Sequence, residues 1–166
     1  VTPLAQPGND RPRLFRLKPD HALINRMGFN NHGVQAAVER LRYRPKHVIV
    51  GGNIGKNKTT PNEDAVDDYV KCFDALYPVV DYFTVNVSSP NTKGLRDLQH
   101  EDALAVLMAT LKGEQAKLAD RHGKYTPLAL KIAPDLEPKA IEGIARLLVK
   151  HGIDGVIATN TTSSRA

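Results

Sequence analysis

This sequence has little cysteine and no long apolar run. Cys72 is the single cysteine, which excludes an internal disulfide framework and a cysteine metal cluster, and we interpret it as a small packing residue in a helix. The six histidines show no paired spacing, so no zinc site is expected. No apolar run is long enough to span a bilayer and no signal peptide is recognisable, so we expect the segment itself to be soluble.

The motifs of three large enzyme classes are also missing. The stretch Gly51–Asn57 (GGNIGKN) approaches a phosphate-binding loop, but its spacing is off by one residue, and Asn57 stands where Ser or Thr should hold magnesium. No GxGxxG follows an apolar run, and no GxSxG surrounds Ser88 or Ser89. These absences argue against a P-loop nucleotidase, a Rossmann dinucleotide site and an α/β-hydrolase.

The charge balance is basic. The formal net charge is +5 and the isoelectric point is near 9.4, with basic groups at Arg11–Lys18 and Arg40–Lys46. Two interpretations stay open: a solvated basic surface, or attraction to an anion such as a phosphate, a carboxylate substrate or an acidic membrane surface. Nucleic-acid binding is not expected, because no basic stripe is interleaved with aromatic residues.

Four short apolar runs end in polar residues or contain one. They are His47–Asn53, Tyr82–Val87, Leu128–Ala133 and Asp154–Thr161. Each of the first three leads into a helical pattern. Because the carboxyl ends of parallel strands meet at one edge and build the site there, this repetition predicts a parallel α/β sheet or barrel.

The second run carries the strongest functional signal. Alternation places Asn86 at the end of a buried strand, where an unbonded amide is costly. Ser89, Asn91 and Thr92 follow at once in a loop. Together these residues offer a hydroxyl for proton transfer and amides that fix a flat polar ligand.

Polar residues in the other runs allow two interpretations. Lys131 lies mid-strand, either at a sheet edge with its ammonium in water, or pointing inward to an anion or cofactor. Asn53, Asn86 and Asn160 are either ordinary strand-end residues or members of one site. Their repetition at equivalent places favours the site.

The rest of the sequence predicts four helices and, near the N-terminus, a short strand and a loop. Leu14–Leu17 is expected as a short edge strand and Asn25–Asn31 as a turn-rich loop. Thr60 is expected to cap a helix, with Pro61 at its first position and Glu63 completing a capping box. The expected helices run from about His32 to Tyr43, from Pro61 to Tyr77, from Glu101 to Arg121 and from Pro138 to Gly152.

The spacing of the four strands fits a piece of a barrel. The distances along the sequence between successive strand starts scatter around roughly 31 residues, the length of one βα unit in an eight-stranded barrel. Four strands cannot close a barrel and leave unpaired edges. The alternatives are an open sheet or part of a larger barrel, and we favour the part.

Five motifs in order resemble one enzyme family, dihydroorotate dehydrogenase, in its membrane-associated, quinone-reducing class. The motifs are NRMGFNN (Asn25–Asn31), NIGKNK (Asn53–Lys58), NVSSPNTKGLR (Asn86–Arg96), KIAPDL (Lys131–Leu136) and DGVIATNTT (Asp154–Thr162). Ser89 indicates this class, because the soluble fumarate- or NAD-linked class carries cysteine at that place.

The resemblance implies a TIM (βα)8 barrel of which residues 1–166 supply about four central units as a partial FMN-binding domain. The N-terminal strands, the segment that admits quinone and the C-terminal strands are expected to lie outside this sequence. The implied reaction oxidises (S)-dihydroorotate to orotate in pyrimidine biosynthesis, with hydride passing to FMN and electrons to a quinone. Peripheral association with the cytoplasmic face of the inner membrane is implied through an absent segment.

The resemblance also assigns residues. Ser89 is implied as the base that removes the C5 proton, with Thr92 and Phe29 near its proton relay. The implied substrate residues are Asn25, Arg26, Met27, Gly28, Phe29, Asn86, Asn91, Asn160 and Thr161. The implied FMN residues are Asn53, Asn86, Lys131 and Thr159. The alternatives are an FMN barrel that reduces another pyrimidine, and a truncated chain that is inactive by itself.

Overall fold

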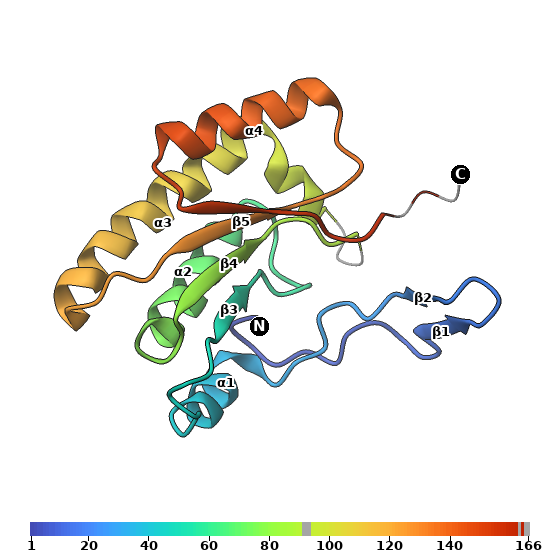
Figure 1. The fold of residues 1–166 in the computed structure, drawn as a ribbon, viewed down its shortest axis with the longest axis horizontal. Coiled ribbons are helices and arrows are strands. Elements are labelled where there is room, and N and C mark those ends of the chain that lie inside the picture. The colour runs from blue at the N-terminus through green and yellow to red at the C-terminus, as the bar shows by residue number, and fades with distance from the viewer. Residues whose placement is uncertain (91–93, 163, 165–166) are drawn as a thin grey trace.

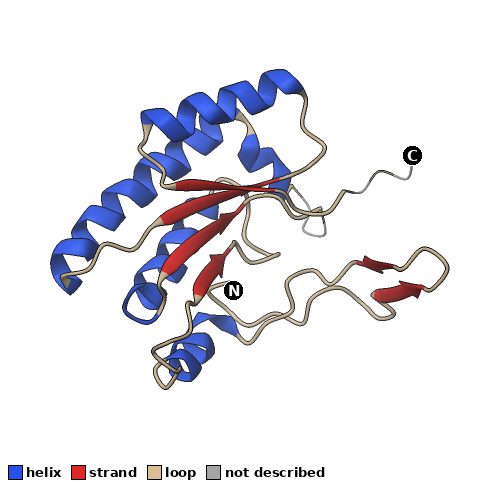
Figure 2. Ribbon diagram, in the orientation of Figure 1, coloured by secondary structure: helices blue, strands red, loops and turns tan. Residues whose placement is uncertain are grey.

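The computed structural model describes residues 1–90, 94–162 and 164. A four-stranded parallel sheet lies beside a layer of helices, and a separate two-stranded hairpin extends away from the sheet (Figures 1 and 2). The elements are β1 (Leu14–Leu17), β2 (Ala22–Asn25), α1 (Gly33–Leu41), β3 (Gly51–Ile54), α2 (Ala65–Leu76), η1 (Tyr77–Val79), β4 (Tyr82–Asn86), η2 (Leu95–Gln99), α3 (Glu101–His122), β5 (Leu128–Ile132), α4 (Pro138–Lys150) and β6 (Gly155–Ala158).

The parallel sheet has the order β3-β4-β5-β6, so each strand pairs with the next along the chain. Neighbouring helices α1, α2, α3 and α4 contact one another in the same order. This regular βα progression confirms the predicted parallel α/β arrangement. All four carboxyl ends therefore lie at one edge, and the polar residues that follow them are brought together.

Strand β4 is buried on both faces. Phe83 and Val85 pack toward the helices, where Phe83 meets Phe73 of α2 with ring centroids 4.4 Å apart. Thr84 and Asn86, on the opposite face, are also buried. Burial of a strand's two faces is typical of parallel sheets, and here it places polar side chains in a covered environment.

Three predicted helices agree with the structure within a few residues. Helix α3 ends at His122, and Gly123 follows in the left-handed conformation that commonly terminates helices. Helix α4 begins at Pro138, and Gly152 lies just beyond its end with a φ of 60°. Cys72 is fully buried within α2, as expected of a packing residue.

The predicted start of α2 is wrong. Thr60 does not cap a helix, because its hydroxyl donates instead to Oδ2 of Asp68 at 2.7 Å. The backbone N–H of Asn57 donates to the same oxygen at 2.9 Å. The helix begins four residues after the expected Pro61, with Asp64 at its N-cap. The hydrogen bonds to the buried Asp68 carboxylate are therefore formed in place of the expected capping box.

Two strand predictions also needed correction. The first core strand covers only Gly51–Ile54 rather than His47–Asn53, because the Asp81 carboxylate binds the N–H of Val50 at 2.7 Å. The expected edge strand β1 is present, but it pairs antiparallel with β2, which the sequence did not predict and which includes Asn25 of the expected loop. None of the helices in the described parts of the chain is long and apolar enough to cross a membrane.

Candidate active site

A cavity of about 210 Å³ lies where the carboxyl ends of β3, β4, β5 and β6 meet the loop after β2. Five chain segments contribute to its wall. The lining residues are Asn25, Met27, Gly28, Phe29, Asn53, Asn86, Ser89, Pro90, Lys131, Asn160 and Thr161. Most residues that the sequence proposed for a site are therefore gathered around one small, mainly polar space.

Asn86 and Lys131 form the floor of this site from adjacent strands. They are register partners in the parallel pair β4–β5, so their side chains lie on the same face of the sheet. Lys131 is half-buried, and its ammonium has no hydrogen bond or ion pair to any residue that the structure describes. A half-buried cation without a counter-charge at a cavity wall is suited to an anionic ligand or an electron-rich ring.

Asn86 is oriented by its neighbours. Its Oδ1 accepts from the N–H of Ser88 at 3.1 Å and from Oγ of Ser88 at 2.8 Å. The backbone carbonyl of Asn86 accepts from the hydroxyl of buried Tyr69 at 2.8 Å. With the oxygen occupied, the Nδ2 donor of Asn86 remains for a ligand, because no described residue accepts from it.

Ser88 connects β4 with β6. Its fully buried hydroxyl accepts from Nδ2 of Asn160 at 3.1 Å while donating to Asn86. Asn160 in turn accepts the N–H of Thr161 on its Oδ1 at 2.8 Å. Sequence reasoning missed this role for Ser88, although an Asn followed two residues later by Ser is a recognisable local turn signal.

Ser89 lines the cavity and is itself buried, with 4% of its surface exposed. A serine hydroxyl in a covered site is screened from bulk water, and a proton-transfer residue of low basicity requires such screening. Asn91 and Thr92, also named from the sequence, lie outside the described residues.

The loop Met27–Phe29 forms the opposite wall. Gly28 and Phe29 both have positive φ, 72° and 57°, which is uncommon for a bulky residue such as Phe29. The Phe29 ring lies against Gly55, where an added Cβ would come within 3.1 Å of the ring. The absence of a side chain at Gly55 therefore makes room for Phe29 at the cavity.

Two residues named from the sequence lie away from this cavity. The guanidinium of Arg26 donates to the carbonyl of Pro12 at 2.9 Å and lies 5.6 Å from the ring centroid of Phe15 in the hairpin. The hydroxyl of Thr159 donates to the carbonyl of Asn160 at 2.7 Å and is exposed. Of the described site candidates, these two do not line the 210 Å³ cavity.

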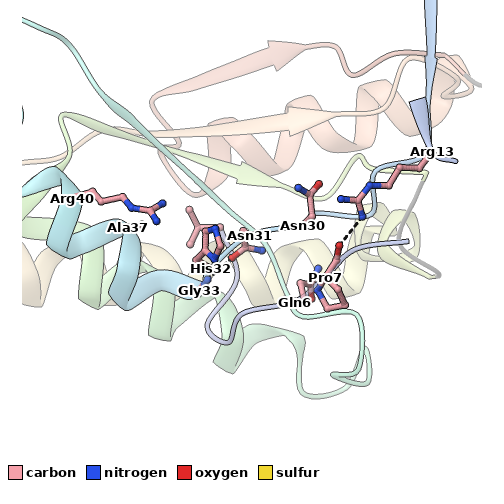
Figure 3. Close-up of a pocket in the computed structure, with 10 residues that line it drawn as sticks. Gln6, Pro7, Arg13, Asn30, Asn31, His32, Gly33, Ala37 and Arg40 are labelled. Carbon is pink, nitrogen blue, oxygen red and sulfur yellow. Dashed lines mark hydrogen bonds between the residues drawn. The ribbon is translucent and has the colours of Figure 1, made fainter. Parts of the chain in front are cut away.

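A larger cavity of about 580 Å³ lies beside Gln6, Asn31 and Arg40 (Figure 3). Of the two arginines that line it, Arg13 already donates to the carbonyls of Pro7 at 2.6 Å and Asn9 at 2.9 Å, and Arg40 is exposed to solvent. None of the polar strand ends lines it. We therefore place the chemistry in the smaller cavity, where those strand ends converge.

This architecture is that of an α/β protein with a parallel sheet and a polar site at the carboxyl ends of its strands. The family model for dihydroorotate dehydrogenase matches residues 1–166, and the chain belongs to that family. The match confirms the expected fold class, because the four-stranded parallel sheet with its helices is consistent with part of a (βα)8 barrel.

Curated relatives carry the name dihydroorotate dehydrogenase (quinone). The Shewanella loihica protein is 58% identical over 165 residues, covering 99% of this chain and 48% of the relative. The Chromobacterium violaceum protein is 59% identical with the same coverage. The ligand-free DHODH of Eimeria tenella superposes with a TM-score of 0.91 at 40% identity, and the chain covers 51% of it. The chain thus spans about half the length of these relatives.

Proposed function

We propose that this chain forms part of an enzyme that oxidises (S)-dihydroorotate to orotate in pyrimidine biosynthesis and passes the electrons to a quinone. The observation that carries the proposal is the single cavity in which buried Ser89 meets the amides of Asn86 and Asn160. The curated relatives named dihydroorotate dehydrogenase (quinone) support the same reaction.

The substrate is held by amides and hydroxyls. Dihydroorotate presents a ring with imide N–H and C=O groups and a carboxylate, which need donors and acceptors on one surface. Asn86 offers Nδ2, and Asn25, Asn160 and Thr161 add polar groups from two other segments. Phe29 and Met27 supply the apolar wall that fixes a flat ring from one side.

The residues present also fit FMN. Lys131 contributes a cation without a described partner, and Asn53 and Asn86 add amides on the same side of the sheet. Bound FMN would supply a hydride acceptor for the oxidation at C6 of dihydroorotate, and Lys131, Asn53 and Asn86 would hold it. Lys131 is proposed to stabilise negative charge on the flavin ring, with Thr159 as a further contact.

Ser89 is proposed to remove the proton from C5. A serine hydroxyl is a weak base near neutral pH, so its proton must pass on as the C5 proton is taken. Burial of Ser89 and the ring of Phe29 across the cavity exclude bulk water from this step. Thr92 is proposed to take part in the relay, and Asn91 in holding the substrate. Arg26 is left out of this set, because its guanidinium contacts Pro12 and Phe15 away from the cavity.

The quinone site and the membrane contact are proposed for the complete protein. Residues 1–166 are proposed as one partial FMN-binding barrel domain, and the segment that admits quinone is proposed to lie outside them. Peripheral attachment at the cytoplasmic face of the inner membrane is proposed through that segment, since an enzyme that reduces a membrane-soluble quinone has to reach the membrane.

The test uses a full-length enzyme that contains these 166 residues, called the full-length enzyme below. Its visible spectrum is recorded before and after anaerobic addition of dihydroorotate. The proposal predicts an oxidised flavin band that bleaches on addition. A flavin band that persists with dihydroorotate but bleaches with a different dihydropyrimidine would overturn the proposed substrate. No bound flavin in the folded enzyme would overturn the cofactor.

A further inference from the structure

The wall formed by Gly28 and Phe29 contains one residue, Phe29, in an unfavourable backbone conformation, whereas glycine adopts a positive φ without steric cost. Two consecutive residues have positive φ, and Phe29 carries a bulky side chain. Such a conformation persists only where the surroundings fix it. The residues that fix it determine where the Phe29 ring lies in the 210 Å³ cavity.

Gln6 holds both carbonyls of this wall from outside the cavity. Its Nε2 donates to the carbonyl of Gly28 at 3.1 Å and to the carbonyl of Phe29 at 3.1 Å. Nδ2 of Asn31 donates to the Phe29 carbonyl as well, at 2.6 Å. Gln6 does not line the 210 Å³ cavity, but faces the larger cavity with Asn31 (Figure 3).

The other end of Gln6 is anchored in the connection between β3 and α2. Its Oε1 accepts from Nδ2 of Asn57 at 2.9 Å and from the N–H of Lys58 at 3.0 Å. Asn57 is buried, and its own N–H donates to Asp68 of α2 at 2.9 Å. This connection begins after Ile54, the last residue of β3, whose neighbour Asn53 lines the cavity. Gln6 thus connects the Gly28–Phe29 wall of the cavity to the segment that joins β3 to α2.

We infer that Gln6 is a positioning residue for substrate binding: its amide holds the Gly28–Phe29 backbone so that the cavity accepts the pyrimidine ring. The inference rests on the proposed function, since it assigns the cavity to dihydroorotate and orotate. Gln6 contacts neither the reacting atoms nor the proposed flavin residues, so its effect appears in substrate affinity rather than in flavin content.

The test compares the full-length enzyme with its Gln6→Glu variant. This change keeps the two acceptor contacts to Asn57 and Lys58 but removes both donors and sets a carboxylate beside two carbonyls. The orotate dissociation constant, read from the perturbation of the flavin spectrum, is expected to rise about tenfold. The KM for dihydroorotate is expected to rise similarly, while flavin content and the reduction rate at saturating substrate stay within about threefold.

Gln115→Glu provides the matched control. Gln115, which is more deeply buried than Gln6, likewise donates from Nε2 to a backbone carbonyl, that of Thr126 at 2.8 Å. Its Nε2 also lies 3.5 Å from Oδ2 of Asp154, and the residue belongs to α3, away from the cavity. Loss of that bond is expected to lower stability without changing orotate affinity. Gln6→Ala is measured in parallel, because half-buried Gln6 can be replaced by a small residue and water if the glutamate variant does not fold.

Several outcomes overturn the inference while leaving the proposed function standing. One is an orotate dissociation constant within twofold of the parent in folded Gln6 variants. Another is a loss of flavin parallel to the loss of orotate, which indicates general disruption. An equal loss of orotate affinity in Gln115→Glu would likewise indicate general disruption rather than a specific role of Gln6. If dihydroorotate fails to bleach the parent enzyme, the proposed function itself fails.

Discussion

Nδ2 of Asn160 donates a hydrogen bond to Oγ of Ser88 at 3.1 Å, joining the ends of β6 and β4 across the candidate site. The same hydroxyl donates to Oδ1 of Asn86 at 2.8 Å. One buried serine therefore fixes the orientation of two amides that line the cavity. Two adjacent serines thus have different roles: Ser88 orients the amides of Asn86 and Asn160, and Ser89 is proposed for proton transfer.

Ser88→Ala is expected to lower both stability and orotate affinity. The change leaves the Nδ2 donor of Asn160 without its acceptor and removes one of the donors to Oδ1 of Asn86. An unpaired buried polar group costs about 1–3 kcal/mol of stability. Unfolding free energy and the orotate dissociation constant of the full-length enzyme measure the two effects. Thr110→Ala is the control, because that exposed hydroxyl bonds only to its own helix. An unchanged orotate affinity in Ser88→Ala would contradict the orienting role.

The backbone arrangement was largely predictable because each core strand carries a local signal. The apolar runs at Tyr82–Val87 and Leu128–Ala133 contain strands β4 and β5, and their polar ends indicated one shared edge. Lys131 and Asn86 proved to be register partners, which follows from the same regularity.

What the sequence did not predict depends on long-range contacts. Thr60 has a good local capping signal, but Asp68 binds its hydroxyl. Ser88 meets Asn160 from 72 positions away, and Gln6 meets Gly28 from 22 positions away. No local pattern contains such pairings, so these residues become visible only when the fold brings them together.

Gly55→Ala is expected to weaken orotate binding. A Cβ at this position would come 3.1 Å from Cε2 of Phe29, so the ring that lines the cavity has to shift slightly from its present position. Binding of orotate to the full-length enzyme is expected to weaken roughly five- to tenfold, the equivalent of about 1–1.4 kcal/mol. Gly113→Ala is the matched control, because nothing lies within 4 Å of its added Cβ. That helix-interior change should raise stability by up to about 1 kcal/mol and leave binding unchanged.

Lys131→Met is expected to weaken flavin retention. The substitution keeps much of the side-chain volume but removes the cation that has no described partner. Loss of a charge-assisted contact corresponds to about tenfold or more in the flavin dissociation constant. Flavin released on dialysis gives the measurement, with exposed Lys139→Met of α4 as the control. Equal flavin retention in the two variants would remove Lys131 from the proposed cofactor site.

The stabilising contribution of Asp81 is expected to disappear in acid. The hydrogen bond from the N–H of Val50 lowers the pKa of the Asp81 carboxyl, partial burial opposes this, and Arg44 at 2.7 Å lowers it further. Because the folded-state pKa lies below the ordinary value of 3.8, the contribution is fully present above that pH. It is lost as the pH falls through the folded-state pKa.

Unfolding of the parent and of Asp81→Asn, measured from neutral pH downward, tests this sign. The stability difference between them should be constant near neutrality and shrink below about pH 4. The exposed Asp120→Asn change in α3 provides the comparison. A difference that grows toward acid pH would show that the carboxylate does not have the stabilising role assigned to it.

The most direct test of the central claim is the rate at which dihydroorotate reduces the bound flavin in Ser89→Ala. Anaerobic stopped-flow absorbance follows the flavin band in the full-length enzyme and in this variant. The account predicts a fall of at least about 10²-fold in the reduction rate, because a positioned base contributes about 10²–10⁴. Flavin content and orotate affinity should stay near the parent values. Reduction at close to the parent rate would contradict the assignment of Ser89, and with it the chemistry proposed for this cavity.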